Sequence, residues 1–229
     1  LAVIFNSHQS RSVILCGNVY DLFLNGSEYM PLIPFFCVIF ATIVLILVVF
    51  EMIGPLRILE DRYKLKSSWI SWKSGVDLDT LLIQGMRDRG KTQVERLGEE
   101  FERLLLNAIG NPTLALELLR QLTICSRSSR LKANLMILVE AADMLLPAGG
   151  GDVASLNDKQ VHRISIVHDW FSDPGFMSGG DSVCLVAESR SLIHPRVSRL
   201  PQVLDVEVSA PDTAQRLAFI EDACLTLQP

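Results

Sequence analysis

The segment LMILVEAAD (Leu135–Asp143) indicates the fold more directly than any other part of the sequence. Its first five residues are apolar, and acidic residues follow them. A short, fully apolar run is typical of a strand that is buried on both faces, as in a parallel sheet. Because ligands of open α/β sheets bind at the carboxyl ends of such strands, Glu140 and Asp143 are candidate site residues.

Further strands and helices are predicted on both sides of this segment. Three other apolar runs predict buried strands, at residues 12–16, 42–50 and 182–187, and residues 204–210 predict a shorter one. Between them, residues 93–110 place apolar side chains on one helical face and end at a glycine, and residues 155–170 begin with a pattern that resembles a capping box. Strands that alternate with helices predict an α/β fold with a parallel sheet and helices on both faces.

The composition excludes several classes of function. The chain has 26 acidic and 21 basic residues, a net charge of -5, and no stripe of Lys or Arg, so we expect no nucleic-acid partner. Its five cysteines form no CxxC pair and its four histidines show no metal-ligand spacing. These cysteines are typical of reduced core residues, which predicts a cytoplasmic protein.

Residues 29–50 are long and apolar enough to raise the question of a membrane span. No charged residue lies between Glu28 and Glu51. However, Pro31 and Pro34 suit the first turn of a short helix, and the end of the segment is rich in β-branched residues. We therefore predict a helix followed by a central strand within residues 30–50. The alternative is a protein anchored in a membrane by a transmembrane helix at this position.

The segment GMRDRGKT (Gly85–Thr92) matches the phosphate-loop pattern GxxxxGK[ST]. In a true loop, backbone N–H groups wrap the phosphates, the lysine neutralises them and the hydroxyl holds Mg²⁺, which makes Gly85, Gly90, Lys91 and Thr92 nucleotide-binding candidates. The interior of this match is bulky, and the preceding residues fit a helix at least as well as a strand. We therefore predict an exposed polar connector in which Lys91 is not a phosphate ligand, so that its replacement leaves the affinity for ATP unchanged; the alternative is a true phosphate loop.

The segment LMILVEAAD also has the form of a Walker B strand. Such a strand ends in a carboxylate that binds Mg²⁺, followed by a second acid that orients the attacking water. Glu140 is the candidate Mg²⁺ ligand, but the next residue is Ala141, which cannot polarise water. Asp143 lies one turn further and is expected to cap or pair locally. The alternative is an ordinary buried strand with polar residues at the edge of its sheet.

Three segments in this order resemble the Walker B, sensor-1, arginine-finger and post-finger segments of an AAA+ ATPase. They are residues 135–147, 182–208 and 211–220. The resemblance covers residues 130–225 well and the N-terminal part loosely. It implies a P-loop NTPase fold, ATP and Mg²⁺ as cofactors, and a homo-oligomeric ring with nucleotide between its subunits.

The same resemblance assigns roles to single residues. Glu140 falls on the metal-coordinating acid, Ala141 on the catalytic glutamate and Ser189 on the sensor-1 polar residue. Arg199 falls on an intersubunit finger arginine, and Gln202 lies where a second finger arginine often stands. The departures at Ala141 and Gln202 suggest a degenerate first module of a tandem AAA+ protein, in which a later module performs the chemistry.

These observations lead to one expected function and two alternatives. We expect an AAA+-like ATPase module that binds nucleotide weakly, does not hydrolyse it, and serves as an assembly or regulatory part of a larger ATPase, partnered by copies of itself or by a second AAA+ module. We expect residues 1–80 to form an N-terminal α/β part and residues 81–229 an AAA+-like core that largely lacks its lid, within a longer protein. The alternatives are the membrane-anchored protein and a non-catalytic scaffold that never binds nucleotide.

Overall fold

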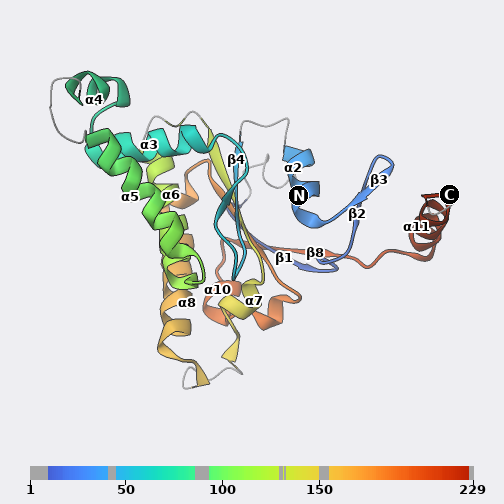
Figure 1. Cartoon of the computed structure of the whole chain (residues 1–229). Helices are drawn as coiled ribbons and strands as arrows, with labels where there is room; N and C mark the ends of the chain where they lie inside the picture. The colour runs from blue at the N-terminus through green and yellow to red at the C-terminus, as the bar shows by residue number, and fades with distance from the viewer. Residues whose placement is uncertain are drawn as a thin grey trace.

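The computed structural model describes residues 10–40, 45–85, 93–128, 131, 133–149 and 155–226. Within these residues, six strands form one sheet in the order β5-β4-β6-β7-β1-β8 (Figure 1). In that order, the strands are Arg57–Ile58, Leu45–Phe50, Asn134–Val139, Ser182–Val186, Ser12–Gly17 and Val203–Val208.

The sheet is parallel except at one edge. Strands β4, β6, β7, β1 and β8 pair in parallel with their neighbours, and only the two-residue β5 pairs antiparallel, with β4. The predicted α/β fold with a parallel sheet is therefore confirmed. Because all five parallel strands point the same way, the residues that follow them lie at one carboxyl edge of the sheet.

Helices cover both faces of this sheet, but unequally (Figure 1). The longer layer consists of α3 (Arg62–Ser74), α5 (Gln93–Ala108), α6 (Pro112–Ser128) and α8 (Asp158–Phe171). On the other face, α2 (Leu32–Phe40) packs against the strands. The side chains alternate accordingly: Ile14 belongs to the core under the longer layer, whereas Val13 and Leu15 belong to the core under α2.

Short elements connect these layers. They are α4 (Leu78–Gly85), α7 (Ala142–Leu145), α9 (Pro174–Met177), α10 (Pro195–Ser198) and the 3-10 helix η3 (Arg190–Leu192). Helix α8 begins two residues later than the sequence predicts, because the capping box is made by Asn157 and Gln160 rather than by Ser155 and Asp158. The amide side chain of Asn157 accepts from the Gln160 N–H at 2.9 Å, and the Gln160 side chain accepts from the Asn157 N–H at 2.9 Å.

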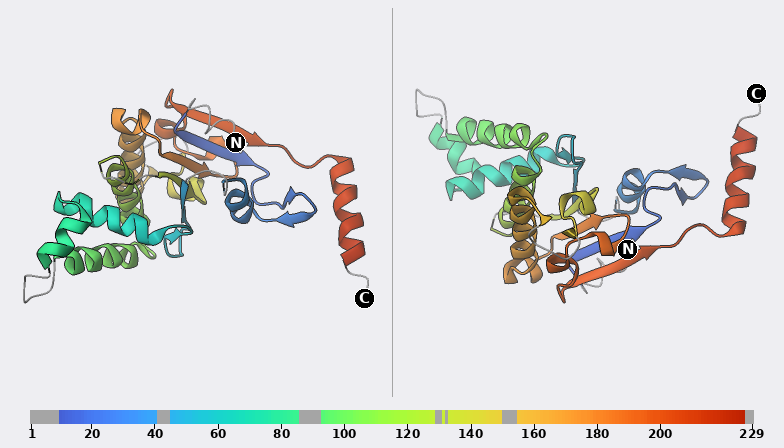
Figure 2. Two further views of the ribbon diagram at one scale, coloured as in Figure 1. Left: turned by 90° about the horizontal axis from the view of Figure 1, so that it is seen from above. Right: turned by 90° about the horizontal axis from the view of Figure 1, so that it is seen from below.

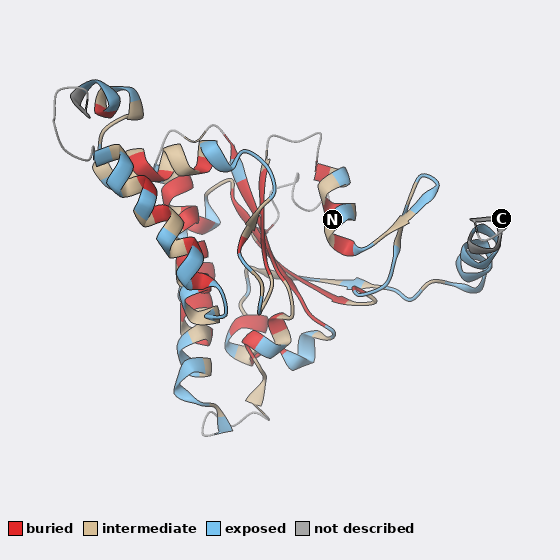
Figure 3. Cartoon of the chain, in the orientation of Figure 1, coloured by how far each residue is buried: buried red, intermediate tan, exposed pale blue. Residues whose placement is uncertain are grey.

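A hairpin and a terminal helix project from the body of the molecule. The hairpin consists of β2 (Phe23–Asn25) and β3 (Glu28–Met30), and the helix is α11 (Thr213–Thr226). Figure 2 shows α11 standing apart from the sheet at the end of an extended segment. The ring of Phe219 meets that of Tyr29 edge to face, with centroids 4.8 Å apart. In Figure 3 the strands are mostly buried, whereas the described part of α11 is exposed.

The predicted helix and strand within residues 30–50 are confirmed. Helix α2 starts one residue after Pro31, and β4 pairs with β6 on one side and β5 on the other. In the described parts of the chain, no helix combines the length and apolar character needed to cross a bilayer.

Strands from both sides of residue 80 belong to the same sheet. Strands β1 and β4 come from the N-terminal 80 residues, and β6, β7 and β8 come from the remainder. The proposed division into an N-terminal part and a core therefore does not correspond to two separate sheets. The sensor-like strand ends at Val186, one residue before the predicted end, and the Walker B-like strand begins at Asn134.

Candidate functional site

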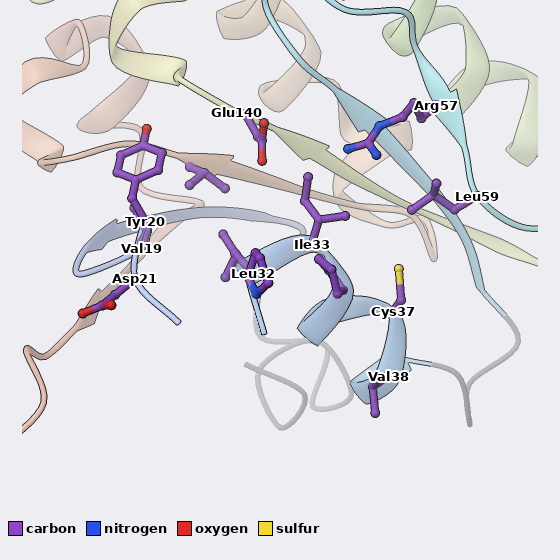
Figure 4. Close-up of a pocket in the computed structure, with 13 residues that line it drawn as sticks. Val19, Tyr20, Asp21, Leu32, Ile33, Cys37, Val38, Arg57, Leu59 and Glu140 are labelled. Carbon is purple, nitrogen blue, oxygen red and sulfur yellow. The ribbon is translucent and has the colours of Figure 1, made fainter. Parts of the chain in front are cut away.

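A cleft of about 610 Å³ opens beside the carboxyl ends of β1, β6 and β7 (Figure 4). Its wall combines the loop after β1, helix α2 and the residue before it, residues in and after β5, the last residue of β7 and the residue that follows β6. Its lining is mostly apolar; the lining residues are Val19, Tyr20, Asp21, Pro31, Leu32, Ile33, Pro34, Cys37, Val38, Arg57, Leu59, Glu140 and Val186. The carboxyl edge of an open α/β sheet is the usual ligand position of such folds, so this cleft is the candidate site.

Glu140 is the acidic residue that strand β6 delivers to the cleft. Its backbone N–H donates to the Phe50 carbonyl at 3.0 Å, which fixes the end of β6 against β4. Burial raises the pKa of its carboxyl, and the nearby Glu51 raises that pKa further, whereas Arg57 lowers it. Among the described residues, no hydrogen bond or ion pair is made by the Glu140 carboxylate. This carboxylate is therefore available to a ligand.

Arg57 is the one basic side chain in the lining of the cleft. Its guanidinium forms an ion pair with Glu51, which follows β4. The buried Nε of Arg57 has no hydrogen-bond partner among the described residues. Because Arg57 already neutralises Glu51, it supplies little net positive charge to the cleft.

Ala141 and Asp143 follow Glu140 at the start of α7. Ala141 has φ 50° and ψ 45°, a left-handed conformation that a residue with a Cβ adopts at a cost of about 1–2 kcal/mol. Asp143 lies in the first turn of α7, and its Oδ1 is buried without a hydrogen-bond partner among the described residues. The expectation that Asp143 caps or pairs locally thus finds no support at this oxygen.

The loop after β1 takes the place that a phosphate loop occupies in a strand–loop–helix unit. Gly17 begins this loop at φ 87°, and a Cβ there would lie 2.5 Å from the Val208 carbonyl oxygen. The Gly17 N–H donates to the Glu188 carbonyl at 3.0 Å, and the Asn18 N–H donates to the Val208 carbonyl at 2.9 Å. The glycine is therefore required by the close approach of β8.

Tyr20 lies in the same loop, and the pKa of its phenol depends on the charges at the carboxyl edge of the sheet. Partial burial raises the pKa of its phenol, and the carboxylates Asp143, Glu140 and Glu188 raise it further. All three carboxylates follow β6 or β7. The field at the carboxyl edge of the sheet is therefore negative.

The predicted phosphate-loop residues lie elsewhere in the fold. Gly85 is the last residue of α4, and α5 begins at Gln93, so the segment connects two helices rather than a strand and a helix. Gly90, Lys91 and Thr92 lie outside the described residues. Helices α4 and α5 stand at the far end of the longer helical layer, away from α2 and the carboxyl-edge cleft (Figure 1).

The other predicted site residues serve local structure or lie on the surface. Ser189 caps η3, and its Oγ accepts from the Ser191 N–H at 3.3 Å. Gln202 donates from its side chain to the Phe171 carbonyl at 3.1 Å, which satisfies the end of α8. Arg199 directly follows α10 and is exposed.

The described residues offer few ligands for Mg²⁺. They contain no group of three or more His, Cys, Asp or Glu side chains arranged to hold a metal ion. Glu140 could supply one carboxylate oxygen to an Mg²⁺ ion, which prefers six oxygen ligands. Sequence reasoning missed the loop at residues 17–22 as part of the site, and the hairpin that follows this loop. The turn signals Gly17-Asn18 and Gly26-Ser27 mark both places.

The fold and this edge define the class of protein. A parallel sheet with helices on both faces, a glycine-containing loop after its first strand, and an acid after β6, the second strand along from β1, form the arrangement of a Rossmann-like α/β domain. Residues 1–209 match the model of the family "AAA+ chaperone, N-terminal Rossmann-like domain", and the chain belongs to that family.

Two further comparisons bear on the fold. A chain in the E. coli MS115-1 HORMA:CdnC:Trip13 complex matches with a TM-score of 0.50 and 10% identity, over 97% of this chain and 56% of that chain. The present chain thus spans 56% of the length of that relative, and at this identity the likeness shows the fold alone. No curated protein sequence matches the chain.

Proposed function

We propose that the chain is an AAA+ module that acts as an assembly or regulatory part of a larger oligomeric ATPase in the cytoplasm and does not hydrolyse ATP itself. One observation carries the proposal: Glu140, which directly follows β6, is itself followed by Ala141, where hydrolysis needs an acid. Loss of a positioned general base costs a factor of roughly 10²–10⁴ in rate. ATP and Mg²⁺ are then the cofactors of a partner module.

The distribution of charge supports an assembly role. Arg196 and Arg199 are exposed on and after α10, whereas Glu188 is exposed at the carboxyl edge of the sheet. A basic surface on one copy or module can therefore face the acidic edge of the next. Such complementarity sets orientation and association rate more than affinity. In this proposal Arg199 is an intersubunit arginine that attracts the acidic edge of the next copy or module and does not contact a transferred phosphate.

Charge reversal tests the assembly role. The mass of the 229-residue chain, alone and mixed with the remainder of its own polypeptide, is measured by light scattering across a concentration series. We expect Arg199→Glu to weaken assembly by about tenfold or more, because it brings like charges together. Arg96→Glu is the matched control, since Arg96 is also exposed but lies on α5. Assembly should return in Arg199→Glu/Glu188→Arg, which restores opposite charges.

Two outcomes would contradict this proposal. One is a chain that stays monomeric in every mixture. The other is assembly that responds equally to Arg199→Glu and to the Arg96→Glu control, because the basic surface would then have no special role.

A further inference from the structure

We infer that the carboxyl-edge cleft excludes nucleoside triphosphates, so that this module holds no ATP at the position where its fold would place one. The inference deepens the proposed function, on which it rests for the assignment of the site. It also departs from the sequence expectation of weak nucleotide binding. Three properties of the described residues carry it: the backbone donors of the loop, the start of α2 and the charge of the edge.

The first property is that four of the six backbone N–H groups at residues 17–22 are already engaged. A phosphate loop binds its ligand through successive free N–H groups. Here the N–H groups of Gly17 and Asn18 bond to the carbonyls described above, and that of Val19 donates to the Gly17 carbonyl at 2.8 Å. The Leu22 N–H donates to Asp21 Oδ1 at 2.9 Å. Four N–H groups that could have cradled a phosphate therefore have partners within the protein.

The second property is the start of α2. A phosphate-binding helix presents free N–H groups, a lysine and a hydroxyl at its first turn. Helix α2 instead begins with Leu32, Ile33 and Pro34, and the proline has no N–H. The β2–β3 hairpin separates this helix from the loop after β1, and the ring of Phe23 stacks on that of Phe35 with centroids 5.1 Å apart. The hairpin is thus packed onto α2, and the loop cannot lead directly into the helix.

The third property is the sign of the charge. Glu140 and Glu188 stand at the carboxyl edge, and the lining of the cleft contains one basic side chain, Arg57, which is paired with Glu51. A triphosphate would bring several further negative charges into a partly buried, mostly apolar space. Like charges at short range in such surroundings repel strongly, and neither a lysine nor an arginine is left to offset them at the lining of this cleft.

A titration with a site-specific readout tests the inference. The 229-residue chain is titrated with MgATP and with MgADP to about 1 mM at low salt and again at high salt, where the repulsion between like charges is screened. Binding is followed by calorimetry, and hydrogen exchange is followed at residues 17–22 and 32–37. We expect no saturable heat and no added protection in either segment. We expect the same for Glu140→Gln/Glu188→Gln, because removal of two charges frees none of the engaged N–H groups.

Saturable binding with added protection at residues 17–22 or 32–37, in the unmodified chain or in the double variant, would overturn the inference. Saturable binding without protection in either segment would place nucleotide outside the cleft and would leave the exclusion standing. Assembly is measured separately and without nucleotide. A chain that assembles but binds ATP in the cleft would refute only the exclusion, and one that neither binds nor assembles would refute only the proposed function.

Discussion

Asp181 precedes β7 and Glu140 follows β6, so these two carboxylates lie at opposite edges of the same sheet. Asp181 is 1% exposed, and its Oδ1 accepts from the Leu135 N–H at 2.8 Å and from Ser126 Oγ at 2.9 Å. Glu140 is half-buried and accepts no hydrogen bond from the described residues. At the amino edge, the Asp181 carboxylate connects β6, β7 and α6 through its hydrogen bonds. At the carboxyl edge, the Glu140 carboxylate makes no such connection among the described residues.

The largest expected difference between the two edges is in the pH dependence of stability. Burial raises the pKa of Asp181 to about 6, although the hydrogen bonds from Leu135 and Ser126 and the charges of Arg127 and Arg11 oppose the rise. Because the folded-state pKa lies above the unfolded value near 3.8, the folded state binds more protons between about pH 4 and pH 6. The contribution of Asp181 to stability is therefore greatest below about pH 4 and falls as the pH rises through 6.

Asp181→Asn should remove this dependence, since the amide keeps an acceptor oxygen but does not ionise. Relative to the variant, we expect the unmodified chain to lose up to about 3 kcal/mol of unfolding free energy between pH 4 and pH 7, measured by urea denaturation. Glu140→Gln is the matched control. Its effect should have the same sign, because the pKa of Glu140 is also raised, and should be smaller, because Glu140 is less buried. Equal slopes for the two variants would contradict the comparison.

A pair of serines gives the next largest expected difference. Ser126→Ala removes a buried hydrogen bond to the Asp181 carboxylate, which should lower the free energy of unfolding by about 1.5 kcal/mol at pH 7. Ser189→Ala removes only a cap on a three-residue 3-10 helix, which should cost about 0.5 kcal/mol. Chemical denaturation of both variants measures the difference. A larger loss at Ser189 would show that the carboxyl edge is the more tightly organised of the two.

Much of the fold follows from the sequence because the central strands β4, β6, β7 and β1 are each a run of mostly apolar residues. Leu135–Val139 and Ser182–Val186 are buried along their whole length, and the prolines before β4 correctly indicated a short helix rather than a span. These features depend on local pattern and on burial, which a single sequence carries. Strand β5 was missed because two residues have no pattern of their own and are ordered only by pairing with β4.

The candidate site was predicted only in part, because the order of the strands in the sheet cannot be deduced from the sequence. Glu140 was predicted because it directly follows the apolar run Leu135–Val139. The loop at residues 17–22 lies at the same site because β1 and β6 are two strands apart in one parallel sheet, with β7 between them. This order cannot be read from the sequence of either strand. By contrast, Gly85–Thr92 matches a motif by letter but follows a helix, where no sheet edge is available to it. A motif is meaningful in the structural context that its chemistry requires.

The smallest expected effect concerns backbone strain at the carboxyl edge. Ala141→Gly should raise the free energy of unfolding by about 0.5–1 kcal/mol, because glycine adopts the left-handed conformation without the Cβ penalty and part of that gain is offset by its freer unfolded state. Ala142→Gly, one residue on and within α7, should instead lower it by about 1 kcal/mol. If both variants were destabilised alike, the strain assigned to Ala141 would be absent.

Steady-state phosphate release from MgATP by the purified 229-residue chain tests the central claim most directly. Phosphoryl transfer needs a positioned water and neutralised charge on the transferred group. At the carboxyl edge, Ala141 stands where an acid would position the water. The carboxylates Glu140 and Glu188 add negative charge where phosphoryl transfer needs positive charge. We therefore predict release at the background rate, both for the unmodified chain and for Ala141→Glu. Steady release by the unmodified chain that Glu140→Gln abolishes would contradict the account and make this module a working ATPase.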